Sequence, residues 1–76
     1  MNKQRRKQLA SICKQLETLK GELEEIQGEE EEYLENIPEN LQGSERYEKA
    51  DEVASALEDA VSQLEEAVEN IHSAME

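Results

Sequence analysis

The chain has 76 residues with no Phe or Trp and only two Tyr, so any core must be aliphatic and thin. Charged residues make up 37% of the chain, a share typical of long helices and coiled coils rather than of globular enzymes. The formal net charge of −12 disfavours contact with nucleic acid or anionic membranes over most of the surface, and it favours basic protein partners.

The remaining bulk features concern cross-links, membranes and size. A single cysteine, Cys13, excludes an internal disulfide. No apolar run is long enough for a signal-peptide core or a membrane span, so we expect a cytoplasmic protein without membrane contact. Because two long helices bury only one seam, and small scaffolds of this kind often add an oligomer interface, we also expect self-association.

The chain begins with a basic segment, defined by Lys3, Arg5, Arg6 and Lys7. Positive charge at a helix N-terminus opposes the helix dipole. In a hairpin, however, this end lies beside the C-terminal end of the second helix. That end is acidic and contains Glu65, Glu66, Glu69 and Glu76. We expect the two ends to form ion pairs, with phosphate binding as the alternative.

The first helix is expected from about residue 3 to residue 35. Its apolar residues recur at alternating steps of three and four, which predicts a coiled-coil seam on one face of the helix. The expected seam residues are Leu9, Ile12, Leu16, Leu19, Leu23 and Ile26, continued by Glu30, Tyr33 and Ile37. Gly21 and Gly28 share a face off this seam, where they mark either the close approach of another helix or weak points.

The end of this helix carries the densest charge of the chain. Four of its glutamates define the acidic cluster, which is our candidate partner-binding site: Glu29, Glu31, Glu32 and Glu35. The cluster is either a solvated face that limits aggregation or a site whose electrostatic repulsion a basic partner relieves. Residues 36–44 form the hinge, in which Pro38 disfavours helix and Ser44 is the natural N-cap of the second helix. We expect Ile37 and Leu41 to close the core at this end.

The second helix is expected from about residue 45 to residue 75, and the same seam period returns in it. Its expected seam residues are Ala50, Ala54, Leu57, Val61, Leu64, Val68, Ile71 and Met75. Beside them runs a second row with a strict period of seven, our candidate oligomer interface: Val53, Ala60, Ala67 and Ala74. The pattern therefore predicts an all-α fold, an antiparallel two-helix hairpin that dimerises into a four-helix bundle.

No arrangement of residues predicts catalysis. Glu69 and His72 have the Glu-x-x-His spacing of di-metal helical bundles. The neighbouring part of the first helix, expected to be residues 5–9, offers no further Glu, so we predict no metal site. No nucleophile, base and orienting acid come together, and no Gly-rich phosphate loop is present. We expect no enzyme activity, no cofactor and no small-molecule substrate.

The segment Glu30–Tyr33 and the run NIPENLQGSERYE at residues 36–48 resemble short, uncharacterised acidic proteins of phages and integrative elements of gut bacteria. The resemblance implies a mobile-element accessory protein and assigns no site residues. Two functions remain open. One is a protein-binding inhibitor whose acidic rod mimics nucleic acid and occupies the basic groove of a host nucleic-acid-binding protein, such as a defence nuclease. The other is a self-assembling structural module without such a target.

Overall fold

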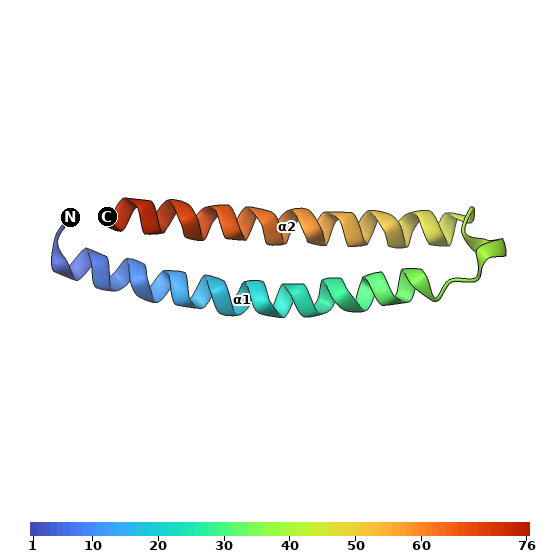
Figure 1. The fold of residues 1–76 in the computed structure, drawn as a ribbon, viewed down its shortest axis with the longest axis horizontal. Helices are drawn as coiled ribbons and strands as arrows, with labels where there is room; N and C mark the ends of the chain where they lie inside the picture. The colour runs from blue at the N-terminus through green and yellow to red at the C-terminus, as the bar shows by residue number, and fades with distance from the viewer.

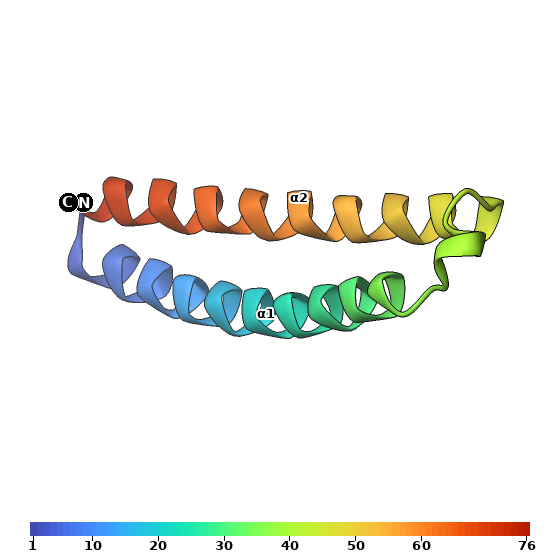
Figure 2. The same cartoon turned by 45° about the vertical axis from the view of Figure 1, so that its right-hand side comes forward.

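The computed structural model describes residues 1–76 and consists of two long helices joined by a short turn. Helix α1 spans Lys3–Glu35, the 3-10 helix η1 spans Glu39–Leu41, and α2 spans Glu45–Met75. The two helices run antiparallel and side by side over most of their length, with the chain termini at one end and the hinge at the other (Figures 1 and 2). The backbone measures 59 × 15 × 13 Å. The all-helical hairpin that the sequence predicts is therefore present, in the form of a single thin layer.

Each long helix begins at a side chain that caps its free backbone N–H groups. The Asn2 Oδ1 atom accepts a hydrogen bond of 2.8 Å from the Arg5 backbone N–H. The Ser44 hydroxyl accepts one of 3.3 Å from the Tyr47 backbone N–H, as the sequence predicts. Such caps satisfy donors that have no partner inside the helix. Between the helices, Pro38 has extended backbone geometry, which ends α1 and lets the chain reverse.

The α2 side of the seam is confirmed. Its most buried residues are Ala50, Ala54, Val61 and Val68. The other expected seam residues of α2 are half-buried: Leu57, Leu64, Ile71 and Met75. Spacings of three and four thus keep one face of α2 against α1 over its full length.

The prediction for the α1 side of the seam is confirmed for one of its two rows and wrong for the other. The row with a period of seven that begins at Leu9 does face α2, and its members are half-buried: Leu9, Leu16, Leu23, Glu30 and Ile37. The prediction for the row that begins at Ile12 is wrong, because its members are exposed: Ile12, Leu19, Ile26 and Tyr33. Their seam positions are taken by the residues that follow each of them: Cys13, Lys20, Gln27 and Leu34.

The difference is a rotation of α1 about its own axis, by about 50° at 3.5 residues per turn. The rotation moves two polar side chains into the seam, and both of them reach its edge. Lys20 packs its stem against α2 while its Nζ lies 3.2 Å from Glu65 Oε1. The Gln27 side chain donates a hydrogen bond of 3.1 Å to Glu31 Oε1. Because both polar heads find partners outside the seam, the rotated helix leaves no buried polar group unsatisfied.

Two smaller expectations about packing are also settled. Ile37 is half-buried at the hinge end, but Leu41 is 49% exposed and does not close the core. The reason is that Leu41 lies in η1, beyond the last turn of both long helices. A Cβ atom added at Gly21 or Gly28 would meet nothing within 4 Å. Neither glycine therefore marks a close helix contact within the hairpin.

Replacement of a buried seam residue tests the observed packing. Val61→Asp places a carboxylate without a partner against α1, and we expect it to lower the free energy of unfolding by more than about 2 kcal/mol. Ser62→Asp, one residue further on the exposed face, is the matched control and should change it by less than about 0.5 kcal/mol. Urea unfolding followed by circular dichroism measures both, and equal effects would contradict the assigned helix faces.

Candidate interaction surface

The rotation of α1 leaves one long side of the hairpin lined with apolar side chains. On α1 this side carries the exposed row, Ile12, Leu19, Ile26 and Tyr33. On α2 it carries the alanine row, Val53, Ala60, Ala67 and Ala74, of which Ala60 and Ala67 are half-buried and the other two are exposed. Each member of the two rows directly precedes a seam residue of its own helix. In an antiparallel pair, these flanking positions of the two helices lie on the same side of the seam, so the two rows run next to each other. We call them together the open apolar face.

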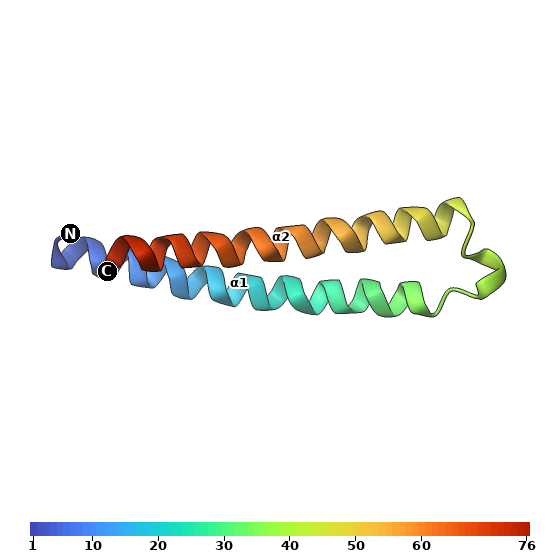
Figure 3. The ribbon, with the colours of Figure 1, turned by 45° about the horizontal axis from the view of Figure 1, so that its top comes forward.

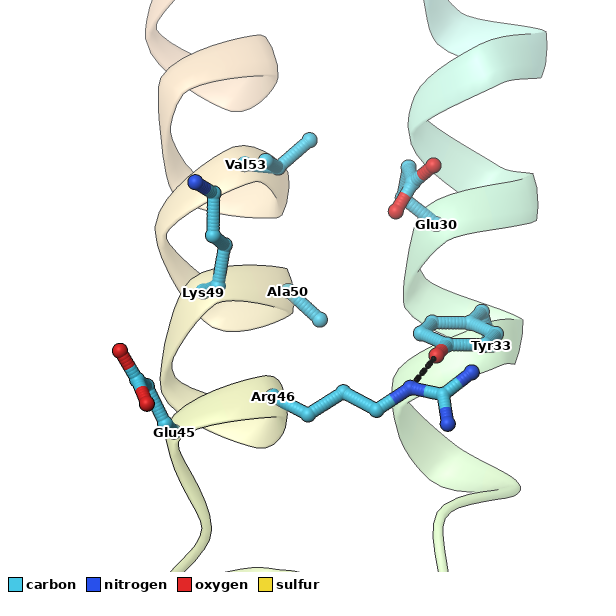
Figure 4. A pocket seen from close by; sticks show the side chains of 7 residues that line it. All are labelled: Glu30, Tyr33, Glu45, Arg46, Lys49, Ala50 and Val53. Carbon is cyan, nitrogen blue, oxygen red and sulfur yellow. Dashed lines mark hydrogen bonds between the residues drawn. The ribbon is translucent and has the colours of Figure 1, made fainter.

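The hinge end shows this neighbourhood directly. Tyr33 of α1 and Val53 of α2 line the same surface groove, together with Glu30 and Arg46 (Figure 4). The Arg46 side chain crosses from α2, and its Nε donates a hydrogen bond of 2.8 Å to the Tyr33 hydroxyl. Its guanidinium carbon lies 5.9 Å from the centre of the Tyr33 ring, within cation–π range. Arg46 belongs to the same seven-residue period as the alanine row and ends the open apolar face at the hinge.

The opposite side of the hairpin is polar. The Lys20 ammonium lies 3.2 Å from Glu65 and 3.8 Å from Glu24, and these are the two ion pairs of the structure. The hydrogen bond that Lys20 donates to Glu65, together with the surrounding carboxylates, holds the pKa of Lys20 above its usual value. Glu17 and His72 lie in the same surface groove as this pair. An interface with another apolar surface therefore has only one suitable side.

This groove corrects the neighbour expected for His72. Residues 5–9 were expected beside His72, whereas Glu17 and Lys20 share its groove. The Lys20–Glu65 contact shows the register of the two helices, which places residues near Cys13 rather than residues 5–9 at the level of His72. No three His, Cys, Asp or Glu side chains come together in a geometry that could hold a metal ion.

The expected pairing of the basic segment with the C-terminal glutamates is wrong. No ion pair joins Lys3, Arg5, Arg6 or Lys7 to α2. Lys20 and Glu65 lie at the same level of the hairpin. Eleven residues from each of them toward the termini, α1 has reached only Leu9, whereas α2 has already ended before Glu76. The basic segment therefore projects beyond the end of α2, as Figure 3 shows. Its charges extend past the acidic residues that were expected to pair with them.

The acidic cluster is exposed and has no cation beside it. All four of its members lie on the surface of α1: Glu29, Glu31, Glu32 and Glu35. The only polar partner of a cluster side chain is Gln27, which donates to Glu31. Repulsion among these carboxylates is therefore uncompensated within the hairpin.

Two further features limit what the molecule presents to a partner. Cys13, the only thiol, is 4% exposed and lies in the seam under α2. Neither long helix contains a stretch apolar enough to cross a membrane. The candidate site is therefore a surface, composed of the open apolar face, the projecting basic segment and the acidic cluster.

Comparison of the chain with protein-family models, with curated proteins and with solved structures finds no match. The proposed function is therefore derived from the geometry and the charge of this surface.

Proposed function

We propose that this protein is a protein-interaction module that acts by helix packing, and that its open apolar face pairs with the same face of a second copy to form a four-helix bundle. The observation that carries the proposal is the exposed row on α1, in which Leu19 is 52% and Ile26 is 47% exposed. Isolated apolar residues on a surface are common, but a continuous apolar row along a helix marks an interface.

The orientation of the apolar stripe supports the proposal. A helix that packs against a single neighbour points the middle of its stripe at that neighbour. A helix in a four-helix bundle points it at the bundle axis, between two neighbours. On α1, the middle of the stripe lies between the Leu9 and Ile12 rows, so it points between α2 and open solvent. On α2, the alanine row widens the apolar surface toward the same side.

The exposed area supports it as well. The hairpin exposes 6000 Å² of surface, whereas a compact monomer of its 8.7 kDa mass exposes about 4,700 Å². A side of 59 by 15 Å has a footprint of about 900 Å², close to the roughly 800 Å² that each partner contributes to a standard protein–protein interface. Pairing of two such faces would bury most of the surface that the hairpin exposes beyond that of a compact monomer.

A charged residue placed in the exposed row tests this function without damage to the seam. We expect Leu19→Asp to remain helical but to weaken self-association at least about 30-fold, because an unpaired carboxylate in an apolar interface costs at least about 2 kcal/mol. Thr18→Asp, the adjacent outward-facing residue, adds the same charge and should self-associate like the wild type. Sedimentation equilibrium measures the dissociation constants. A wild-type hairpin that is monomeric at micromolar concentration and unfolds cooperatively would contradict the proposal.

We propose a second candidate function on the acidic cluster, namely occupation of a basic nucleic-acid-binding groove on a host protein. The observation that favours it is the absence of any cation within ion-pair distance of Glu29, Glu31, Glu32 or Glu35. A row of unpaired carboxylates on a rigid helix offers a basic groove the negative charge of a phosphate backbone. The resemblance of residues 36–48 to accessory proteins of phages and integrative elements fits such a role.

Removal of the cluster charges tests this candidate. The change of all four cluster residues to Gln keeps their size, and the variant should lose salt-sensitive capture of nucleic-acid-binding proteins from bacterial lysate while remaining folded. The matched control removes four exposed charges elsewhere by the changes Glu58→Gln, Glu66→Gln, Glu69→Gln and Glu76→Gln. Equal capture by both variants, or prey that do not compete with nucleic acid, would exclude the candidate.

A further inference from the structure

We infer that the second copy on the open apolar face is turned end for end, so that the hinge of each copy lies beside the termini of the other. The inference rests on the proposed self-association. It adds the orientation of the two copies and the placement of their charges relative to each other.

Charge is distributed unevenly along the hairpin. The terminal half, residues 1–20 and 65–76, carries six basic and five acidic groups, a net charge of +1. The hinge half, residues 21–64, carries two basic and fifteen acidic groups, a net charge of −13. Copies with both hinges at the same end would place two halves of −13 side by side. The end-for-end arrangement places each of them beside a half of +1, which electrostatic complementarity favours.

The end-for-end pair is symmetric. A two-fold axis that crosses the hairpins at right angles stacks the two α1 helices on each other, antiparallel, and likewise the two α2 helices. Leu19 is the middle residue of α1. When the axis passes at Leu19, this residue meets Leu19 of the second copy, and Ile12 meets Ile26 of the second copy. From the Lys20–Glu65 contact, the same axis crosses α2 close to Ala67, where the small side chain allows close approach of the two helices. The apolar rows of the two copies therefore overlap in their central part, where Ala60 also meets Ala74, whereas Tyr33 and Val53 meet no apolar partner.

The basic segment and the acidic cluster lie at opposite ends of one copy. With the axis at Leu19, the basic segment at residues 3–7 lies at the level of residues 31–35 of the second copy, and Arg5, which continues the period of the exposed row, meets Tyr33 there. Glu31 shares the polar side of Glu24, so the charge of the acidic cluster is offset without direct contact. Both groups are exposed and form no ion pair within the hairpin. The basic segment also projects beyond α2 and has no neighbour within the hairpin (Figure 3). Each dimer would contain the contact between Arg5 and Tyr33 twice, once at each end.

Distances between spin labels test the orientation. The label is attached in the hinge through Asn40→Cys, an exposed position, with Cys13→Ala to leave one thiol per chain. Double electron–electron resonance on the dimer should give a hinge-to-hinge distance on the order of the 59 Å length of the hairpin. Copies with both hinges at the same end would give about 20–25 Å, two helix diameters, and this result would overturn the inference.

A second labelled site gives the opposite expectation and serves as a control. Gln4→Cys carries the label at the terminal end of α1, at an exposed position far from the axis. A mixture of hinge-labelled and end-labelled chains should show a short distance that neither sample shows alone, and its absence in a dimer would contradict the inference. Circular dichroism checks that each variant folds, and sedimentation checks that it dimerises. A monomeric sample would contradict the proposed function itself, whereas a dimer with the wrong distances contradicts only the orientation.

Discussion

The structure depends on one packing constraint: two helices that meet along a single seam cannot cover more than one apolar stripe of ordinary width. Here both helices carry more apolar surface than that seam covers. The α2 helix has a complete seam and the alanine row beside it. The α1 helix divides its stripe between the seam and solvent, which leaves Leu19 and Ile26 about half exposed. The residual surface is not scattered, since both helices leave it on the same side.

Much of the fold follows from local features of the sequence. The heptad spacing, Pro38 and the Ser44 cap are sufficient to predict two antiparallel helices with a turn between them. These features act within a few residues, so the sequence displays them directly. The Asn2 cap of α1 is a signal of the same kind, because an Asn directly before a helix is a preferred N-cap residue.

The rotation of α1 could not be predicted in the same way. Periodicity shows which residues share a stripe, but not which edge of the stripe faces the neighbouring helix. That choice depends on whether Lys20 and Gln27 can sit in the seam and still reach polar partners, and Glu65 and Glu31 provide these partners. The side chain of Leu19, placed in the core by its spacing, lies outside it for this reason. The Lys20–Glu65 contact also marks the register of the two helices, in which the basic segment extends beyond α2.

The charge pattern links assembly to the acidic surface. A net charge of −12 on a rod of this size opposes any close contact between two copies. The opposition is strongest at the hinge half, so an arrangement that separates the two hinge halves retains the apolar contact and avoids most of the repulsion. The acidic cluster itself lies mostly away from the open apolar face, since Glu31 shares the seven-residue period of Glu17 and Glu24, so the second copy offsets its charge without covering it. A basic host protein would therefore be able to bind the cluster of a dimer, but it would meet a negative potential that the basic segments of the dimer have already reduced.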